Sequence, residues 1–413
     1  MKNPIQDKHI LLGVTGSIAC YKAVDLASKL AQAGGQIDVI LTAAAQQFVT
    51  PLTFQSVTGR RAYTDADLWG NEGHIQHIGL GKSADLLVIA PASANTLAKL
   101  AHGIADNLLS VTALAAACPI LVAPAMDGGM FSHPATQANL ETLRQRKVDV
   151  FGPVEGHLAS GLVGIGRMIE PEQLLGHIRY LLARDGPLRS LRIVVTAGGT
   201  QEPIDPVRSI TNRSSGKQGF ALAQAALNLG ADVTLIAGTT GLPAPVGARR
   251  VDVRTAQQML DAVMASIQQA DALVMAAAVA DFRPVAPADQ KIKKEAGVPE
   301  IHLAPTADIL AAVAEFKEQT GLPRVTVGFA AESQSLIENA TAKLTAKKLD
   351  IIVANDISSS DAGFAADTNR VTLLFADGQR CDLPLLDKVE VAGLVMNYIL
   401  ERLQALDVNR DPK

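Results

Sequence analysis

Small and hydroxyl-bearing residues follow three apolar segments in the first half of the chain, where a phosphate-bearing ligand could bind. Gly16 and Ser17 stand in the segment GVTGSIA, which ends a predicted strand and begins a helix. Thr42 and Ser93 follow two further predicted strands. A glycine lets the backbone approach a ligand closely, and the N–H groups at a helix start favour an anion. The segment matches no nucleotide-binding fingerprint, so a tight strand–helix turn explains it equally well.

Two histidines, His74 and His77, are the titratable candidates in this half. Histidine can move a proton near neutral pH, although a single histidine is more often structural. Three further segments lie downstream: ADNLLS, which ends at Ser110, PAMDGGM, which contains Asp127, and ASGLVGIGRM, which contains Ser160. The last belongs to a long glycine-rich stretch without a sustained period, and loops of that length in compact domains are usually functional.

Lysines are the main candidates in the second half. The segment KIKK begins at Lys291, and AKLTAKK contains Lys343 and Lys347; both follow predicted strand ends. Most lysine runs are solvated surface, but at the carboxyl edge of a parallel sheet they would face a triphosphate. An earlier polar segment, DPVRSITNRSSGKQG, contains Asn212 and leads into a helix. Its SSGKQ part lacks the residues of a Walker motif.

These residues need strand ends to position them, and the chain supplies alternating strand and helix patterns. Short apolar runs such as HILLGVTG, QIDVILT and LLVIAPA are separated by helical patterns, which is typical of parallel α/β units. The alternation restarts after a linker at 186–191, and the segment 370–380 predicts a hairpin. We therefore predict an α/β fold with two doubly wound domains, a flavodoxin-like domain at 1–186 and a Rossmann-like domain at 191–405.

The composition limits the partners. The chain has 413 residues with 41 acidic and 37 basic side chains, a net charge of −4, which gives no electrostatic reason to expect nucleic acid or an anionic membrane as a partner. No apolar run is long enough to span a bilayer, and the N-terminus lacks a signal-peptide pattern. The three cysteines, Cys20, Cys118 and Cys381, have no metal-binding spacing. Reduced thiols in a cytoplasmic protein are the expected state.

The motifs of the first half, taken in order, resemble the flavin-dependent cysteine decarboxylases, a family that includes phosphopantothenoylcysteine decarboxylases. The resemblance covers residues 8 to 180 and implies that the chain binds FMN. The family's catalytic histidine stands eight residues before the aspartate of its AD motif, which makes His77 the catalytic residue and His74 a bystander. The residues implied for FMN are Gly16, Ser17, Thr42 and Ser93, with Ser110 nearby.

Two catalytic positions depart from the family pattern. The family's PAMN reads PAMD, which places Asp127 where an amide contacts the substrate carboxylate. Its ACG reads ASG, which places Ser160 where a cysteine donates a proton. A cysteine thiol has a reference pKa of about 8.5, and a serine hydroxyl is a far weaker acid. The resemblance thus leaves open whether Ser160 supports the final reductive step.

The second half resembles the CTP-dependent phosphopantothenate–cysteine ligase domain, from Leu191 to about residue 400. The motifs that carry the resemblance are DPVRSITNRSSGKQG and AAAVADFRP followed by KIK. It implies that Asn212 handles an acyl-cytidylate intermediate and that Asp281 acts through Mg²⁺. The residues implied for CTP are Met275, Ala276, Ala277, Asp281, Lys291, Ala307, Asp308, Ile309, Leu310, Phe329, Lys343 and Lys347.

The order of the two halves resembles the bifunctional bacterial enzymes of coenzyme A biosynthesis. It implies coupling of 4′-phosphopantothenate to cysteine with CTP, then FMN-dependent decarboxylation of 4′-phosphopantothenoylcysteine to 4′-phosphopantetheine. It also implies a homo-oligomer with trimeric decarboxylase and dimeric ligase units, up to a dodecamer. Two alternatives are a ligase whose flavin domain has impaired decarboxylation and a flavoprotein-like regulatory subunit that binds a partner protein. A nicotinamide dehydrogenase is disfavoured because neither half carries GxGxxG followed by a strand-end acid.

Overall fold

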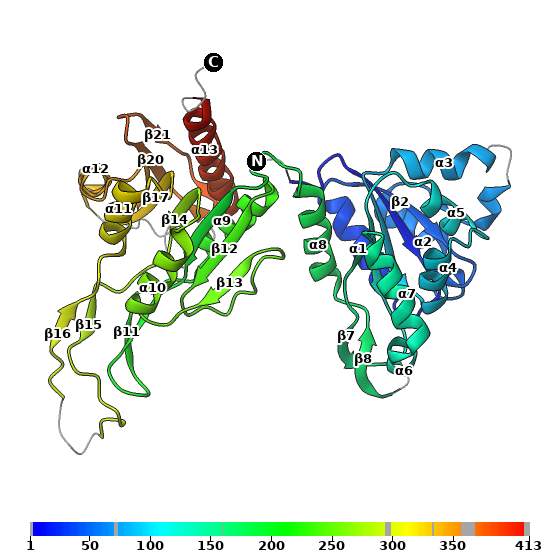
Figure 1. Ribbon diagram of the computed structural model, residues 1–413, viewed down its shortest axis with the longest axis horizontal. Coiled ribbons are helices and arrows are strands. Elements are labelled where there is room, and N and C mark those ends of the chain that lie inside the picture. The colour runs from blue at the N-terminus through cyan, green and yellow to red at the C-terminus, as the bar shows by residue number, and fades with distance from the viewer. Residues whose placement is uncertain are drawn as a thin grey trace. The chain divides into compact units, whose positions relative to one another are not determined.

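The computed structural model describes residues 3–69, 73–159, 161–293, 299–332, 334–356 and 368–408, without the side chains of 73–75, 332 and 356. Ser160 and the side chain of His74 lie outside the described residues. The chain divides into two compact units, Lys2–Leu182 and Ala183–Lys413. Each unit contains one large sheet with helices around it (Figure 1).

The first unit is built on a six-stranded sheet that is parallel throughout, in the order β3–β2–β1–β4–β5–β6. The strand order reverses between β1 and β4, and such a switch point opens a crevice at the carboxyl ends of the strands. The strands are β1 His9–Val14, β2 Gln36–Leu41, β3 Ala62–Tyr63, β4 Leu86–Ala92, β5 Ile120–Pro124 and β6 Asp149–Val150, with a separate hairpin of β7 Val154–His157 and β8 Val163–Arg167.

Helices cover both faces of this sheet (Figure 1). One buried cluster joins Leu12 to Leu26 of α1 and Ile178 of α8, and another joins Leu11 to Leu109 of α5 on the opposite face. This alternation confirms the predicted doubly wound arrangement. The helices are α1 Cys20–Gln32, α2 Pro51–Thr58, α3 Gly73–Ser83, α4 Ala94–His102, α5 Leu108–Ala115, α6 Gly128–Ser132, α7 Pro134–Gln145 and α8 Pro171–Ala183, with 3₁₀ turns η1 Ala45–Gln47 and η2 Asp65–Leu68.

The second unit is built on an eight-stranded sheet in the order β13–β12–β9–β14–β17–β18–β20–β21. It is parallel from β13 to β18, and β20 and β21 continue it antiparallel, which confirms the hairpin predicted at 370–380. The strands are β9 Arg192–Ala197, β12 Asp232–Ala237, β13 Arg249–Asp252, β14 Ala272–Met275, β17 Val325–Glu332, β18 Ile351–Asp356, β20 Val371–Phe375 and β21 Arg380–Asp382.

Helices again cover both faces, with α9 and α13 on one face and α10, α11 and α12 on the other. They are α9 Lys217–Asn228, α10 Ala256–Ile267, α11 Ile309–Thr320, α12 Leu336–Ala346 and α13 Lys388–Val408. Among the described helices, none combines the length and hydropathy that a membrane span requires.

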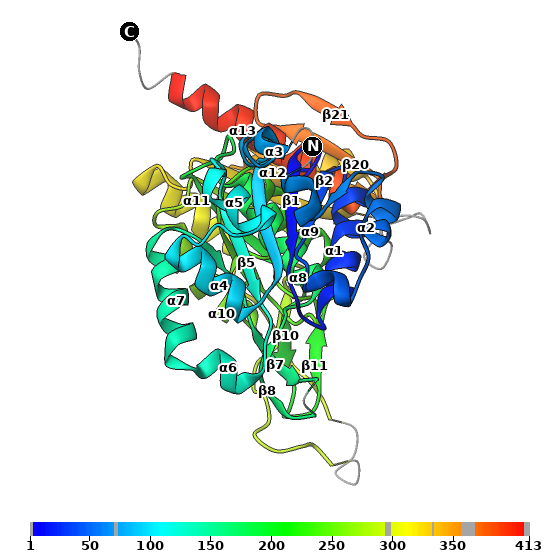
Figure 2. The ribbon, with the colours of Figure 1, turned by 90° about the vertical axis from the view of Figure 1, so that its right-hand side faces the viewer.

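Short antiparallel pairs supplement the second sheet. They are β10 Gln201–Pro203 with β11 Ser209–Thr211, β15 Phe282–Pro284 with β16 Leu303–Pro305, and β19 Thr368–Asn369 with β22 Leu386–Asp387. The first two pairs extend away from the main sheet and form an arm, in both views (Figure 1, Figure 2).

A buried carboxylate, Asp38, ties the amino-terminal edge of the first sheet together. It is 4% exposed, its two oxygens accept from Arg60 Nε and Nη2 at 2.9 and 2.8 Å, and His9 Nε2 lies 2.6 Å from Oδ2. Burial acts to raise the pKa of Asp38, but the hydrogen bonds from His9 and Arg60 outweigh it and the pKa is lowered. The hydrogen bond to Asp38 is the main reason that the pKa of His9 is raised.

We expect Asp38→Asn to lower the free energy of unfolding by about 3 kcal/mol, because it leaves a buried ion pair with one partner. Since the pKa of His9 is raised, its contribution is complete below the ordinary value of 6.5 and is lost as the pH rises through the raised pKa. Urea unfolding of the full chain across this pH window checks both points. Asp25→Asn, which removes an exposed partner of Lys29, is the control and should change stability little.

Candidate active sites

Threonine and backbone hydrogen bonds tie three strand ends of the first unit together. The buried Thr15 hydroxyl, just after β1, donates to Pro91 O at 2.7 Å and accepts from Ser93 N at 2.9 Å. The backbone N–H of Thr42, just after β2, donates to Val14 O at 3.1 Å. The carboxyl ends of β1, β2 and β4 therefore lie together, and Thr42 and Ser93 lie at one edge of the sheet.

Gly16 and Ser17 follow directly at the same edge. A Cβ on Gly16 would lie 2.5 Å from the Cβ of Ala44, so only glycine permits this approach between the two strand-end turns. Ser93 caps α4, and its Oγ accepts from Thr96 N at 3.3 Å. The edge thus presents hydroxyl groups and backbone N–H groups, which suit a phosphate.

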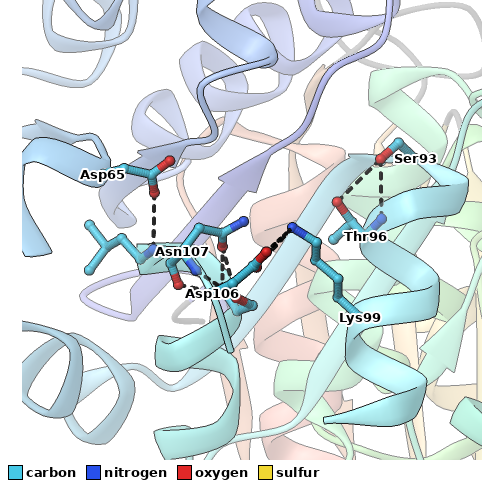
Figure 3. A network of polar contacts seen from close by, with 8 residues as sticks. Asp65, Ser93, Thr96, Lys99, Asp106 and Asn107 are labelled. Carbon is cyan, nitrogen blue, oxygen red and sulfur yellow. Dashed lines mark hydrogen bonds and ion pairs between the residues drawn. The ribbon is translucent and has the colours of Figure 1, made fainter. Parts of the chain in front are cut away.

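Ser110 has a structural role, because its hydroxyl belongs to the cap of α5. Its backbone N–H donates to Asn107 Oδ1 at 2.9 Å, and its Oγ donates to Asn107 O at 3.1 Å. Figure 3 shows this capping network beside the ion pair of Lys99 with Asp106, whose Nζ and Oδ1 atoms are 2.8 Å apart. The carboxylate of Asp65 lies nearby and accepts a hydrogen bond from the first N–H of α5. The network orders the segment between α4 and α5.

His77 lies on α3, which packs against α5. Its Nδ1 is buried and has no hydrogen-bond partner among the residues that the structure describes. Unpaired buried atoms are uncommon in folded proteins, and a bound group or a catalytic role is among the explanations for one.

Asp127 and the β7–β8 hairpin lie against each other. Asp127 caps α6, and its Oδ1 accepts from Gly129 N at 2.9 Å. In β8, Gly166 has φ +152°, and Met126 N donates to its carbonyl oxygen at 3.0 Å. A Cβ on Gly166 would lie 2.2 Å from Met126 O, so the contact requires glycine. The structure thus brings two sequence motifs, PAMD and GIGRM, into contact.

A buried lysine anchors the carboxyl end of this hairpin. Lys22 of α1 is 4% exposed, and its Nζ donates to Met168 O at 2.9 Å and to Glu170 Oε1 at 3.0 Å. Glu170 also accepts from Arg167 Nη2 at 2.5 Å. The helix that follows the GVTGSIA turn therefore holds the base of the hairpin.

The second unit contains a cavity of about 590 Å³ at the carboxyl edge of its sheet. A cavity of this size is ordinary for a small-molecule ligand. All the residues predicted for CTP except Lys291 line it, together with Asn212. They are Met275, Ala276, Ala277, Asp281, Ala307, Asp308, Ile309, Leu310, Phe329, Lys343 and Lys347.

Two threonines hold the loop that follows β14. Ala277 N donates to Thr196 Oγ1 at 3.1 Å, and Ala280 N donates to Thr200 Oγ1 at 2.9 Å. Asn212 Nδ2 reaches the same loop and donates to a backbone carbonyl, Val279 O, at 2.9 Å. One wall of the cavity is thereby fixed to the end of β9.

The amino-terminal ends of α9 and α11 both face this cavity, and only the α11 end carries a charged capping side chain. Asp308 caps α11, accepts from Ala311 N at 3.0 Å and pairs with Lys347. Burial acts to raise the pKa of Asp308, but the hydrogen bonds from Lys347 and the Ala311 N–H outweigh it, so the pKa is lowered. By contrast the residue at the cap position of α9 is Gly216, which has no side chain to cap the helix. The amino-terminal end of α9 therefore favours an anionic ligand.

Lys291 lies elsewhere. It is exposed, follows β15 on the arm, and does not line the cavity. Lys343 lies on the lining, and its Nζ donates to Phe329 O at 3.1 Å.

The cavity also includes residues that the sequence reasoning missed. Asn369 of β19, 3% exposed, donates from Nδ2 to Gln218 Oε1 at 2.9 Å, and Gln218 Nε2 donates to Lys388 O at 3.2 Å. The Oδ1 atoms of Asn369 and Asn355 are buried and without a hydrogen-bond partner in the described part of the chain. Asn355 lies near the end of a strand in the motif VANDIS, so its position in the sequence could have identified it as a site residue. Asn369 and Lys388 follow no strand of the main sheet, and the sequence gives no such indication for them.

Comparisons with known proteins match both units. The family model Flavoprotein matches residues 1–182, and the family model DNA/pantothenate metabolism flavoprotein C-terminal domain matches residues 188–403. The coenzyme A biosynthesis bifunctional protein CoaBC of Bacillus subtilis is 44% identical over 398 residues, 96% of this chain and 97% of that protein. The protein of the same name from Escherichia coli is 42% identical over 398 residues, again 96% and 97%.

Two solved structures are also similar. One is the C-terminal domain of coenzyme A biosynthesis bifunctional protein CoaBC, with 40% identity, a TM-score of 0.46, and coverage of 54% of this chain and 100% of that chain. The other is a PPC decarboxylase mutant complexed with pantothenoylaminoethenethiol, with 32% identity, a TM-score of 0.39, and coverage of 42% and 97%.

The matched families define this chain as a flavoprotein of pantothenate metabolism with two α/β domains. More particularly, the chain belongs to the family of the coenzyme A biosynthesis bifunctional proteins CoaBC. Because relatives cover both units over nearly their full length, neither the ligase-only alternative nor the regulatory-subunit alternative is favoured.

We expect Gly166→Ala to release the hairpin from the Met126 turn, because the added Cβ would overlap Met126 O and the backbone is strained for alanine by about 1–3 kcal/mol. Limited proteolysis should then cut the hairpin faster than in the wild type. The matched control is Gly164→Ala in the same strand, since a Cβ there meets nothing within 4 Å. Equal cutting rates in the two variants would show that the close contact does not hold the hairpin.

Proposed function

We propose that the second unit couples 4′-phosphopantothenate to cysteine with CTP, and that the first unit decarboxylates the product, 4′-phosphopantothenoylcysteine, with FMN. We place the two activities in domains at 1–186 and 191–405. The observation that carries the proposal is the lining of one cavity by Asn212 and all but one of the residues predicted for CTP. Family membership supports the pairing of the two reactions.

In the ligase site, a carboxylate must first become a good acyl donor. Attack of the carboxylate on the α-phosphorus of CTP forms the acyl-cytidylate and releases pyrophosphate. The cysteine amine then attacks the acyl carbon and displaces CMP. Lys343 and Lys347 supply positive charge beside the triphosphate, and the uncapped start of α9 supplies N–H donors. Asp281, an exposed carboxylate on the lining, is the proposed Mg²⁺ ligand, because carboxylate oxygen suits this ion. Asn212, beside the Val279 carbonyl, is proposed to bind the acyl-cytidylate.

In the decarboxylase site, Gly16, Ser17, Thr42 and Ser93 are proposed to hold the FMN phosphate. Three features support a phosphate here: the four residues lie at one edge of the sheet, the backbone approaches closely at Gly16, and the hydroxyl groups are neutral donors. FMN, when bound, supplies the redox chemistry of the reaction. Ser110 lies nearby and orders the start of α5.

The chain's own residues do the rest of the decarboxylation. His77 exchanges a proton with the substrate through a ring nitrogen. Asp127 faces the substrate carboxylate from the PAMD turn, and the β7–β8 hairpin covers the turn and excludes water. Ser160, the proposed substitute for the family's proton-donating cysteine, lies outside the described residues.

We also propose that the chain acts in the cytoplasm as a homo-oligomer, with trimeric decarboxylase and dimeric ligase units, up to a dodecamer. Large apolar side chains exposed in the first unit and on the arm of the second unit support this, because such side chains favour burial in an interface. In the first unit they include Ile18, Tyr21 and Leu52, and in the second unit they include Val207, Phe282, Val285 and Leu303.

One anaerobic assay tests the function. The full chain, loaded with FMN, receives 4′-phosphopantothenate, cysteine, CTP and Mg²⁺, and mass spectrometry identifies the products. We expect 4′-phosphopantetheine, CMP and pyrophosphate. Accumulation of 4′-phosphopantothenoylcysteine without loss of CO₂ would support the ligase and refute the decarboxylase, and no CTP-dependent product would refute the ligase.

We expect Lys347→Ala to weaken CTP binding by roughly 1.5–3 kcal/mol, or about 10- to 150-fold, because it removes a charge-assisted contact to the triphosphate. Titration calorimetry measures the Kd. The matched control is Lys348→Ala, the next residue, which pairs with Glu318, is exposed and does not line the cavity. A similar loss of CTP affinity in both variants would mean that Lys347 contributes only through the net positive charge of the surface and not through a contact with CTP.

We expect His77→Asn to abolish CO₂ release while flavin stays bound, because the asparagine side chain cannot exchange a proton at neutral pH. Anaerobic CO₂ release and the flavin absorbance spectrum are measured on the same sample. The control is His102→Asn, which replaces an exposed histidine bonded to Asn139. Full CO₂ release by the His77 variant would remove this residue from the mechanism.

A further inference from the structure

The carboxylate of Asp205 is buried and accepts hydrogen bonds at both oxygens. Asp205 is 2% exposed. Its Oδ1 accepts from the backbone N–H groups of Val207 and Arg208, both at 2.8 Å. Its Oδ2 accepts from Arg208 Nε at 2.9 Å and from Ile292 N at 3.1 Å. The hydrogen bond from the Arg208 side chain is the main reason that the pKa of Asp205 lies well below its usual range.

Two more hydrogen bonds join the same two segments. Arg208 Nη2 donates to Ile292 O at 2.9 Å, and Ala288 N donates to Ile204 O at 2.9 Å. The N–H and the C=O of Ile292 are therefore both held, one by Asp205 and one by Arg208. We call this set of contacts the Asp205 clamp.

The clamp connects two ligase segments that are far apart in the sequence. On one side, Arg208 leads through β11 to Asn212, whose side chain contacts the loop after β14. On the other side, Lys291 directly precedes Ile292. The side chain of Lys291 is exposed and does not line the cavity, so packing of that side chain does not hold the backbone of this segment in place. The clamp supplies that restraint.

We propose that Asp205 is a positioning residue of the ligase reaction, which fixes the backbone that carries Lys291 relative to the segment that carries Asn212. The inference rests on the proposed ligase function and on the CTP contact that the family resemblance implies for Lys291. A lysine on a four-carbon stem places its charge usefully only if its backbone is fixed, because misplacement of a reacting group by about 1 Å can cost on the order of 100-fold in rate.

Asparagine at this position is a sharp test because it preserves the shape of the side chain. Both oxygens of Asp205 act only as acceptors. Either orientation of an amide would therefore direct its own N–H groups at other donors. Asp205→Asn should break the clamp without creating a cavity.

The first readout does not depend on activity. Trypsin cuts after lysine, and the clamp holds the peptide group that follows Lys291, so cutting at this bond should be slow in the wild type. We expect mass spectrometry of the full chain to show faster cutting there in Asp205→Asn. The matched control is Asp382→Asn, which removes a carboxylate that accepts from Arg380 and Thr372 at the far edge of the sheet. It should leave the cutting rate at Lys291 unchanged.

The second readout is kinetic. We expect Asp205→Asn to lower the ligase kcat by about 10- to 100-fold and to add no further loss in a Lys291→Ala background. Thermal melting reports whether the variant folds. If it does not, Ile292→Pro removes the N–H that Asp205 accepts, leaves the carboxylate in place, and should lower kcat to a similar extent.

The outcomes separate the two proposals. An active wild type with unchanged kcat in the folded variant would overturn the positioning role alone, as would losses that multiply with Lys291→Ala. Unchanged cutting after Lys291 in Asp205→Asn would show that the clamp does not restrain this segment, and would also overturn it. A wild type without CTP-dependent product would refute the ligase function and this role with it.

Discussion

Both units are organised by the burial of parallel strands on two faces. Every residue of β4 is buried, and the strands of both sheets contribute alternate side chains to apolar clusters on opposite faces. Such strands are mostly apolar inside the sheet, and their backbone groups pair with neighbouring strands. Polar groups that bind a ligand therefore gather where the strands end, and in a parallel sheet these ends share one edge.

Threonine hydroxyls stabilise that edge in both units. Thr15 links the ends of β1 and β4 in the first sheet, and Thr196 and Thr200 hold the loop after β14 in the second. Each hydroxyl accepts a backbone N–H that the irregular turn would otherwise leave unpaired. The turns are thereby ordered before any ligand binds, and a preorganised site loses less free energy to ordering when it binds.

The segments that reach beyond the sheets are held by a few specific contacts rather than by a large apolar core. The β7–β8 hairpin depends on the close approach at Gly166 and on the buried Lys22. The arm of the second unit depends on the Asp205 clamp.

The sequence by itself determined the α/β class, the doubly wound units and the hairpin near the C-terminus, and its family motifs implied most of the cavity lining. The alternation of strands and helices indicates a parallel sheet, in which strand-end residues such as Thr42, Ser93 and Ala277 share the carboxyl edge. Only the tertiary structure decided that Lys291 lies on the arm and that β19 and the start of α13 complete the cavity. Those placements depend on contacts between residues far apart in the chain, which no local period or spacing encodes.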